Sequence, residues 1–328
     1  MRGWNTSSSQ DIPEAHMDLK QLRALVTVVE TGSVTRAAQL LHLVQPAVTR
    51  QIKALEEELG VTLFERTRTG MHATDAGEAL AERARRALTE LERARAELTP
   101  PTGAVTGIVT VGLLESTVDL LAEPLVARLA SDHPGVELRL QTAYSGHLQR
   151  WLDDGDLDLS LLYNLTSSPS LNVTPLLREQ LWIAAPPDVG LRSDRPVPFA
   201  DITSRRLILP TDGHGLRTLV NSGAQQAGIS LNSAVSTNSM AIQKRLTRTG
   251  HGWTILPAVG LAEEVAAGLL CAAPLCEPEV LRTIVLATAR TGRVPPAVTI
   301  VARELTRLIG MTVARNRWPS AEPLLREQ

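Results

Sequence analysis

The first quarter of the chain holds polar residues at spacings suited to contacting DNA. QPAVTRQIK, residues 45–53, places four polar side chains on one side of a predicted helix: Gln45, Thr49, Arg50 and Lys53. Glutamine and arginine can form paired hydrogen bonds to base edges, threonine can contact a thymine methyl group, and lysine can neutralise phosphate. Between Arg36 and Leu55 the sequence has three cations and no acid. An ordinary helical hairpin with a solvated face is the alternative interpretation.

Two short helices joined by a tight turn would position these side chains. Ser33 is a good N-cap for the first helix, residues 42–44 make the turn, and Pro46 suits the first turn of the second helix. A preceding helix over 18–31 would pack beneath the pair. The apolar stripe that buries the second helix recurs at spacings of 4, 3 and 4: Val48, Ile52, Leu55 and Leu59.

A small hairpin is predicted after the second helix. VTLFER, residues 61–66, has the composition of a strand, TRTG predicts a turn, and residues 71–73 return. Arg66 and Arg68 flank the tip, where arginine can contact phosphate or enter the minor groove. Alone, each would more often be a solvated surface charge; beside this hairpin we favour the DNA contact.

The order of residues in this region resembles a known family. QPAVTRQIKALEEELGVTLFER is similar to the recognition helix and wing of the LysR-type transcriptional regulators, and the resemblance extends through SVTRAAQLLHL upstream and RTRTGMHATDAGEAL downstream. It implies a winged helix-turn-helix that binds double-stranded promoter DNA. The DNA contacts that we assign on this basis are Thr35, Gln45, Pro46, Thr49, Arg50, Lys53, Arg66 and Arg68.

Two positions depart from the family pattern. A small capping residue often precedes the Gln-Pro pair, whereas this chain has Val44, so we expect Gln45 to cap the helix weakly. Thr49 stands where serine is common, and its methyl group would alter the preferred base. Both departures bear on sequence preference and leave the fold unchanged.

Composition bounds the class of protein. The 328 residues are 43% hydrophobic, enough for sizeable cores, and only 3% aromatic, which argues against a base-stacking surface for single strands or RNA. The net charge of −2 gives no sign of nucleic-acid binding, so the DNA prediction depends on where charges lie. Residues 1–16 have no apolar signal core and the chain has no membrane-spanning run; we expect a disordered tail and a cytoplasmic protein.

A long helix should connect the DNA-binding region to the rest of the chain. Thr74 is its predicted N-cap, and at about 1.5 Å per residue it would extend about 37 Å to Leu98. Its apolar seam should pair with the same helix of a second subunit, although packing on the chain's own effector domain is the alternative. The seam has spacings of 4, 3, 4, 3 and 4: Leu80, Ala84, Ala87, Leu91, Ala94 and Leu98.

The remaining chain alternates predicted strands and helices, the pattern of an α/β fold with largely parallel sheets. GDLDLSLLY and GHGWTILP resemble phrases of the family's effector domain, which implies two α/β subdomains of periplasmic-binding-protein-like type. We expect a tail over 1–16, a winged helix-turn-helix domain over 17–75, a linker helix and hinge over 76–103, and an effector-binding domain over 104–328. Its first subdomain would cover about 104–164 and 283–328, and its second about 165–282.

Four strand-to-helix turns carry polar side chains at the edge where such folds bind ligands. Residues of this kind are usually plain helix caps, but four turns in a two-lobed domain make an effector cleft the better prediction. Glu115 and Asp212 would add negative charge, so an anionic effector is not assumed. The effector contacts that we assign are Ser116, Thr117, Ser145, His147, Thr211, His214 and Asn238.

Two other functional classes compete. An enzyme could use Ser145, His147, Asp212 and His214, but the sequence has no nucleophile elbow, Gly-rich phosphate loop or paired metal-ligand helix. A thiol redox sensor could use Cys271 and Cys276, which we place in a late loop; a structural role is favoured.

We therefore predict a one-component transcription factor, with no enzymatic activity, no cofactor and no metal site. Its partners would be promoter DNA, a small polar metabolite, a second copy of the chain in a homodimer that pairs into a homotetramer, and RNA polymerase.

Overall fold

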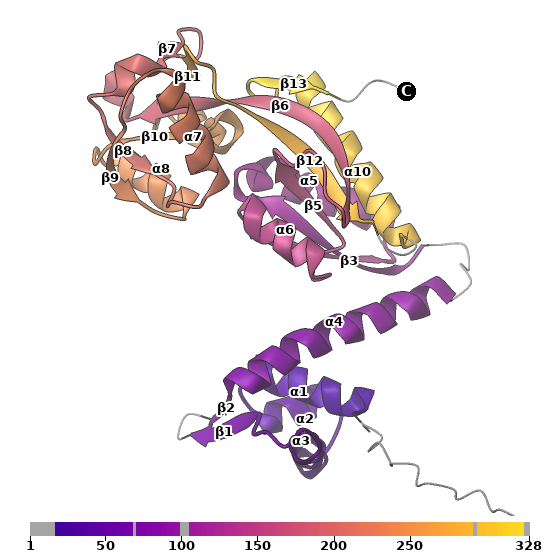
Figure 1. Ribbon diagram of the computed structural model, residues 1–328. Helices are drawn as coiled ribbons and strands as arrows, with labels where there is room; N and C mark the ends of the chain where they lie inside the picture. Colours follow the sequence, from indigo (N-terminus) through magenta and orange to yellow (C-terminus); the bar gives the residue numbers. More distant parts are fainter. Residues whose placement is uncertain (1–16, 68–69, 99–104, 291–293, 325–328) are drawn as a thin grey trace, which may run out of the picture. The chain divides into compact units, whose positions relative to one another are not determined.

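The computed structural model describes residues 17–67, 70–98, 105–290 and 294–324. The predicted tail over 1–16, Arg68 and the end of the predicted hinge, residues 99–103, lie outside the described residues. The chain divides into two compact units, residues 1–98 and 99–328 (Figure 1). Each unit is described by itself.

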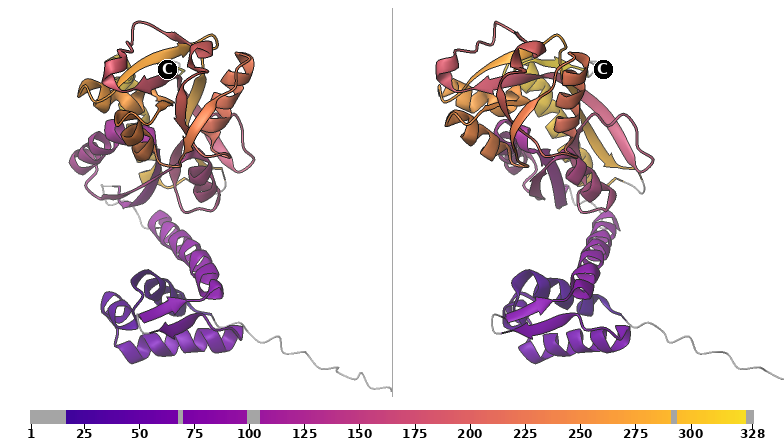
Figure 2. Two further views of the ribbon diagram at one scale, coloured as in Figure 1. Left: turned by 90° about the vertical axis from the view of Figure 1, so that its left-hand side faces the viewer. Right: turned by 60° about the vertical axis from the view of Figure 1, so that its left-hand side comes forward.

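The N-terminal unit is a bundle of helices with a two-stranded hairpin (Figure 2). Asp18 caps the first helix and forms a capping box with Gln21, and Ser33 accepts a hydrogen bond from the Arg36 N–H, confirming it as the cap of the second helix. The elements are α1 (Leu19–Thr31), α2 (Val34–Leu40), α3 (Gln45–Leu59), β1 (Phe64–Thr67), β2 (Gly70–Ala73) and α4 (Asp75–Leu98).

Three of the four predicted stripe residues of α3 are buried. Val48, Ile52 and Leu55 are at most 2% exposed, but Leu59 is 39% exposed because it lies at the end of the helix beside Gly60, beyond the core. The prediction that Gln45 caps this helix is wrong. Val44 occupies the N-cap position without a side-chain hydrogen bond, and α3 begins at Gln45.

The start of the β1–β2 hairpin contacts both α3 and α4. The Glu56 carboxylate of α3 accepts hydrogen bonds from the Leu63 N–H at 2.8 Å and the Phe64 N–H at 3.2 Å. On the other side, a Cβ added at Gly77 in α4 would lie 2.1 Å from the Leu63 carbonyl oxygen, so only glycine permits this approach. The Thr74 hydroxyl accepts from the Gly77 N–H at 3.1 Å, as expected of the helix cap.

The C-terminal unit is built on one mixed sheet of 11 strands, in which the central strands pair antiparallel. Its main path runs β4-β3-β5-β12-β6-β10-β8-β9, parallel at both ends and antiparallel around β12 and β6. The predicted parallel sheets are therefore found only in the outer strands. The strands are β3 (Gly107–Leu114), β4 (Val136–Ala143), β5 (Leu159–Tyr163), β6 (Leu171–Ala185), β7 (Val197–Pro198), β8 (Arg206–Leu209), β9 (Asn232–Ser236), β10 (Trp253–Pro257), β11 (Cys271–Cys276), β12 (Leu281–Ala289) and β13 (Ala321–Pro323).

Helices cover the sheet on both faces. The α-helices are α5 (Val118–Asp132), α6 (Ser145–Asp153), α7 (Gly215–Gln226), α8 (Met240–Arg248), α9 (Ala262–Ala266) and α10 (Pro296–Ala314). Short 3-10 turns are η1 (Glu115–Thr117), η2 (Pro187–Val189), η3 (Phe199–Ile202) and η4 (Ala258–Leu261). Within the described ranges, every helix is too short or too polar to span a lipid bilayer.

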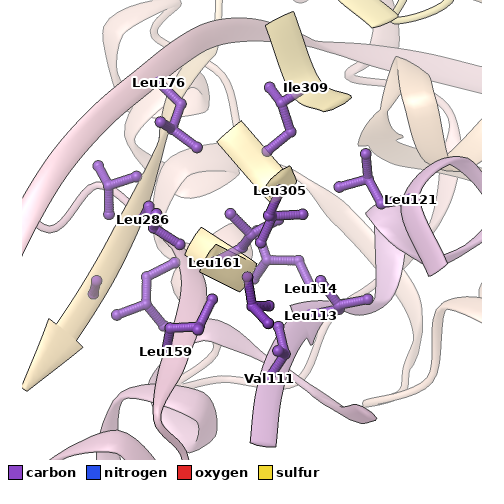
Figure 3. Packing of buried hydrophobic residues seen from close by; sticks show 14 of the residues in the cluster. Val111, Leu113, Leu114, Leu121, Leu159, Leu161, Leu176, Leu286, Leu305 and Ile309 are labelled. Atoms are coloured by element: carbon purple, nitrogen blue, oxygen red, sulfur yellow. The ribbon is translucent and has the colours of Figure 1, made fainter. Parts of the chain in front are cut away.

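Two separate hydrophobic cores define two lobes. In the first lobe, leucines of α5 and α10 pack on β3 and β5, as Leu121, Leu305 and Leu161 illustrate (Figure 3). The second lobe is organised around residues such as Phe199, Leu207 and Ile255. The long strands β6 and β12 run from one lobe into the other (Figure 1). This is the predicted α/β fold with two subdomains.

The structure places the lobe boundary and the cysteines differently from the sequence prediction. Leu171, Leu176 and Leu177 at the start of β6 belong to the first core, although we assigned them to the second subdomain. Cys271 and Cys276 are the two ends of strand β11 and not part of a loop, because this segment pairs with β6 and β7.

Candidate functional site

The predicted base-contacting residues lie at the solvent-exposed side of α2 and α3. Thr35, Pro46 and Lys53 are exposed, as are Gln45 and Arg50. The Thr49 side chain is half-buried, and its hydroxyl donates a hydrogen bond to the Gln45 carbonyl oxygen at 3.1 Å. Its methyl group and the lone pairs of its hydroxyl oxygen remain for contact with a base.

The cations on this side have no acidic partner in the part of the chain that the structure describes. Among the described residues, no carboxylate forms an ion pair with Arg36, Arg50 or Lys53. The nearest acid in sequence, Glu56, is used to hold the start of the hairpin. The positive charge of this surface is therefore available to phosphates. Arg66 lies in β1 with its side chain outside the described part, and Arg68 is not described.

The α4 seam is covered for only part of its length. Ala84 is 3% exposed, and Leu80 is half-buried against the core of the N-terminal unit, so this part of the predicted dimer seam packs within its own unit. Ala87 and Ala94 are exposed and Leu91 is 44% exposed. The side chain of Leu98 is outside the described part. The exposed apolar stretch is thus Ala87 to Ala94.

Three contacts join the two lobes of the C-terminal unit at the predicted turns; we call this region the lobe interface. The Glu115 carboxylate accepts a hydrogen bond from the Met240 N–H at the start of α8, at 3.4 Å. The Tyr144 and His214 rings meet edge-to-face with centroids 4.1 Å apart. A Cβ added at Gly215 would lie 2.9 Å from the Tyr163 hydroxyl, so the start of α7 approaches this ring closely.

The predicted hydroxyl residues of the first lobe have different surroundings. Ser116 accepts a hydrogen bond from Arg282 at 2.7 Å, and Ser145 accepts one from the Tyr163 N–H at 3.1 Å; each hydroxyl still has a hydrogen to donate. Thr117 is fully buried and donates to the Leu114 carbonyl oxygen at 2.9 Å. A ligand could not reach Thr117 without displacing this turn, so its assignment as an effector contact is not supported.

The predicted polar residues of the other turns are only partly brought together. His214 caps α7 through Nδ1, which accepts from the Leu216 N–H at 3.0 Å, and the Thr211 carbonyl oxygen accepts from the His214 N–H at 3.2 Å. The exposed His147 ring lies 6.0 Å from the Tyr144 ring. Asn238 is exposed, and Ser239 rather than Asn238 caps α8.

A buried charged group at the lobe interface was missed by the sequence analysis. Arg282 of β12 donates from Nε to Glu179 Oε1 at 2.8 Å, and Trp318 Nε1 donates to Glu179 Oε2 at 2.9 Å. The guanidinium carbon lies 5.2 Å from the Tyr163 ring centroid. The available signal was a lone arginine and a lone glutamate inside two apolar strands, because unpaired charges are rarely buried.

The surroundings at the lobe interface shift the pKa values of His214 and Tyr144. Burial, the charge of Arg282 and then His147 lower the pKa of His214 to about 4, so its ring is neutral at pH 7. Because Nδ1 accepts a hydrogen bond, the proton resides on Nε2. Burial, followed by Glu115 and Tyr163, raises the pKa of Tyr144 to about 12. The neutral rings can donate hydrogen bonds, while the formal charges belong to Glu115, Arg282 and Glu179.

Family models match both units. The model described as "Bacterial regulatory helix-turn-helix protein, lysR family" matches residues 19–78, and the "LysR substrate binding domain" model matches residues 102–309. The HTH-type transcriptional regulator BbuR of Bordetella bronchiseptica is 30% identical over 310 residues, covering 94% of this chain and 95% of its own length. The DNA-binding transcriptional dual regulator OxyR of Escherichia coli is 30% identical over 268 residues, covering 82% and 88%.

Solved structures share the fold. Full-length OxyR from Pseudomonas aeruginosa, in a substituted form, is 23% identical with a TM-score of 0.68, covering 95% of this chain and 99% of its own. CbnR in complex with its target DNA is 24% identical with a TM-score of 0.67, covering 89% and 99%. Together with the exposed helix-turn-helix and the two-lobed domain, these matches define a DNA-binding regulator with a ligand-responsive domain. The chain belongs to the LysR family of bacterial transcriptional regulators.

The lowered pKa of His214 predicts a pH dependence of stability. An unfolded histidine has a pKa of about 6.5 and the folded His214 about 4. Between these values the unfolded chain binds a proton that the folded chain does not, so the free energy of unfolding should fall as the pH is lowered from about 6.5 to about 4. His214→Asn keeps a capping side chain without titrating and should lose less stability between pH 7 and pH 5, as measured by urea unfolding. Equal losses in both proteins would contradict this role of His214.

Proposed function

We propose that α3 is the recognition helix of this regulator and reads promoter DNA in the major groove. The observation that carries this proposal is the exposed side of α3, where Arg50 and Lys53 have no acidic partner among the described residues. Gln45 and Arg50 contact base edges, and the Thr49 methyl group contacts a thymine. Thr35, Pro46 and Lys53 lie against the backbone, and Arg66 and Arg68 of the hairpin contact phosphates or the minor groove.

This division of roles predicts different effects for the two cations. Arg50→Ala should cost about 1–3 kcal/mol of binding free energy on the specific site and relax the base preference there. Lys53→Ala should weaken specific and scrambled DNA alike and reduce the dependence of affinity on salt. Fluorescence anisotropy at several salt concentrations measures both effects.

The exposed Lys20 of α1 supplies the matched control, because Lys20→Ala removes a cation from another helix and should leave both affinities close to wild type. If Arg50→Ala discriminated specific from scrambled DNA as well as the wild type, Arg50 would not read a base.

We propose that the exposed part of the α4 seam joins two copies of the chain. Leu91 is 44% exposed between the exposed Ala87 and Ala94, and a partner helix would bury this stretch. Leu80, Ala84 and Leu98 complete the seam, with Leu80 and Ala84 shared with the core of their own unit. Two such dimers would form a tetramer on an interrupted inverted repeat.

A charge placed in this seam should separate the subunits. In Leu91→Glu, two carboxylates would meet across the contact, so sedimentation of the full-length protein should show a lower mass with the chain still folded. Thr89→Glu places the same charge on the far side of the helix, because two residues turn about 200°, and should leave the mass unchanged. A wild-type mass for Leu91→Glu would mean that the subunits associate elsewhere.

A small polar metabolite is proposed to bind at the lobe interface and to change the action of the protein on DNA. The contacts carried forward from the sequence are Ser116, Ser145, His147, Thr211, His214 and Asn238, of which His147 and Asn238 are exposed. A ligand that touches both lobes favours one arrangement of them by its difference in affinity for the two. Through the α4 helices, this would alter DNA bending or the spacing of half-sites.

We infer that the chain is a regulator without enzymatic activity of its own. The residues that an enzyme could use are committed to other contacts: Ser145 pairs with the Tyr163 N–H and His214 caps α7. Among the described residues, neither His147 nor His214 is hydrogen-bonded to Ser145. Access to chromosomal DNA and to RNA polymerase requires a cytoplasmic protein, and no cofactor or metal enters this account.

The positions of the two cysteines argue against thiol sensing through a disulfide between them. Their Cα atoms are five strand positions apart, about 16 Å, and an odd spacing points the side chains to opposite faces. A disulfide needs Cα atoms within about 7 Å, so Cys271 and Cys276 of one β11 cannot pair. Burial, with Glu277, Asp201 and Glu279, raises the pKa of Cys276 and makes its thiolate scarce. We therefore favour effector binding over thiol sensing by this pair of cysteines.

A further inference from the structure

Ser116 at the lobe interface has an acid next to it in the chain and a cation hydrogen-bonded to its hydroxyl. Glu115 precedes Ser116 in the chain, and the Arg282 guanidinium donates from Nη2 to the Ser116 hydroxyl at 2.7 Å. Arg282 is only 3% exposed and is held in place by Glu179, which Trp318 fixes in turn. The Ser116 turn therefore brings a fixed guanidinium and the carboxylate of the preceding residue to the same interface.

The guanidinium is only partly used by the protein. Nε donates to Glu179, Nη2 forms an ion pair with Glu179 Oε1 at 2.6 Å, and Nη2 donates to Ser116. Nη1 has no hydrogen-bond partner within the described ranges, and both oxygens of Glu179 are already engaged by Arg282 and Trp318. A ligand carboxylate is the group that matches unused guanidinium donors. The Ser116 hydroxyl can add a donor to the same carboxylate.

The neighbouring carboxylate makes a simple acid a poor ligand here. Glu115 forms no ion pair with any described residue, and its single hydrogen bond, from the Met240 N–H, is long at 3.4 Å. An acid bound to Arg282 would lie close to this half-buried negative charge and be repelled. An ammonium group beside the ligand's carboxylate converts the repulsion into an ion pair.

We propose that the effector is an α-amino acid, with its carboxylate on Arg282 and Ser116 and its ammonium group on Glu115. The carboxylate and ammonium groups of an α-amino acid are carried by one carbon, so a single small ligand presents both to the Ser116 turn, where Arg282 bonds the hydroxyl and Glu115 is the preceding residue. The amino-acid side chain would extend toward the Tyr144 and His214 rings. This inference rests on the effector site proposed above and narrows its ligand to one chemical class.

Calorimetry on the full-length protein tests the inference. The probes are the twenty common amino acids and, for each one that binds, the matching acid without its amine and the matching amine without its carboxylate. The amino acid should bind at least about tenfold more tightly than either analogue, because each analogue leaves one charge of the site unpaired. Equal affinity of the wild type for the amino acid and its deaminated acid would overturn the inference.

Glu115→Gln separates the role of the carboxylate from folding. The substitution keeps size and hydrogen bonding, and it should bring the affinities for the amino acid and its deaminated acid within about twofold of each other by removing the ion pair. Glu123→Gln, on an exposed position of α5, should keep the wild-type preference. A preference that survives in Glu115→Gln would contradict the assignment of the ammonium site.

Two further binding results distinguish an effector of another chemical class from the absence of an effector site. A metabolite of another class that binds the wild type, and binds Ser145→Ala several-fold more weakly, would overturn the amino-acid assignment and keep the lobe interface as the site. If neither the amino acids nor a broad metabolite panel bind, both proposals fall.

Discussion

The C-terminal unit depends on one buried ion pair where its two long strands cross between the lobes. Glu179 of β6 and Arg282 of β12 are direct cross-strand partners, nearly inaccessible to solvent, and Trp318 completes the hydrogen bonds of the carboxylate. Removing one partner of such a pair costs about 3–5 kcal/mol, since the other charge is left buried and unpaired. The pair thus fixes a cation beside Ser116 and Tyr163, which makes the lobe interface suitable for a charged ligand.

Local patterns were sufficient to predict the elements and their class. Ser33 and Thr74 cap their helices as expected, and Val48, Ile52 and Leu55 form the buried side of α3. Leu59 and the placement of Cys271 in a loop were wrong, because exposure at a helix end and pairing with β6 depend on the rest of the fold. The antiparallel centre of the sheet could not be predicted for the same reason: strand direction is set by partners distant in sequence.

The two candidate sites differ in how far the sequence could predict them. Gln45, Arg50 and Lys53 lie on one short helix, so their common surface could be predicted from helical spacing. The lobe interface brings together Ser116, His214 and Arg282 from three distant segments. The residues around Arg282 in the sequence do not predict its contact with Ser116, which is 166 residues away. The serine and threonine residues at the turns could be identified from the sequence. The hydroxyl of Thr117, however, donates a hydrogen bond to a carbonyl oxygen within its own turn, and only the three-dimensional structure shows this contact.

Backbone amide hydrogen exchange tests most directly whether a small molecule acts by binding between the two lobes, as we propose. The full-length protein would be compared with and without its tightest-binding metabolite. Binding at the lobe interface should slow exchange in segments 212–218 and 237–243, at the starts of α7 and α8, and in 115–118 of the first lobe. Slowed exchange confined to one lobe, or centred on the groove between α5 and α10 near Leu125 and Met311, would contradict the claim.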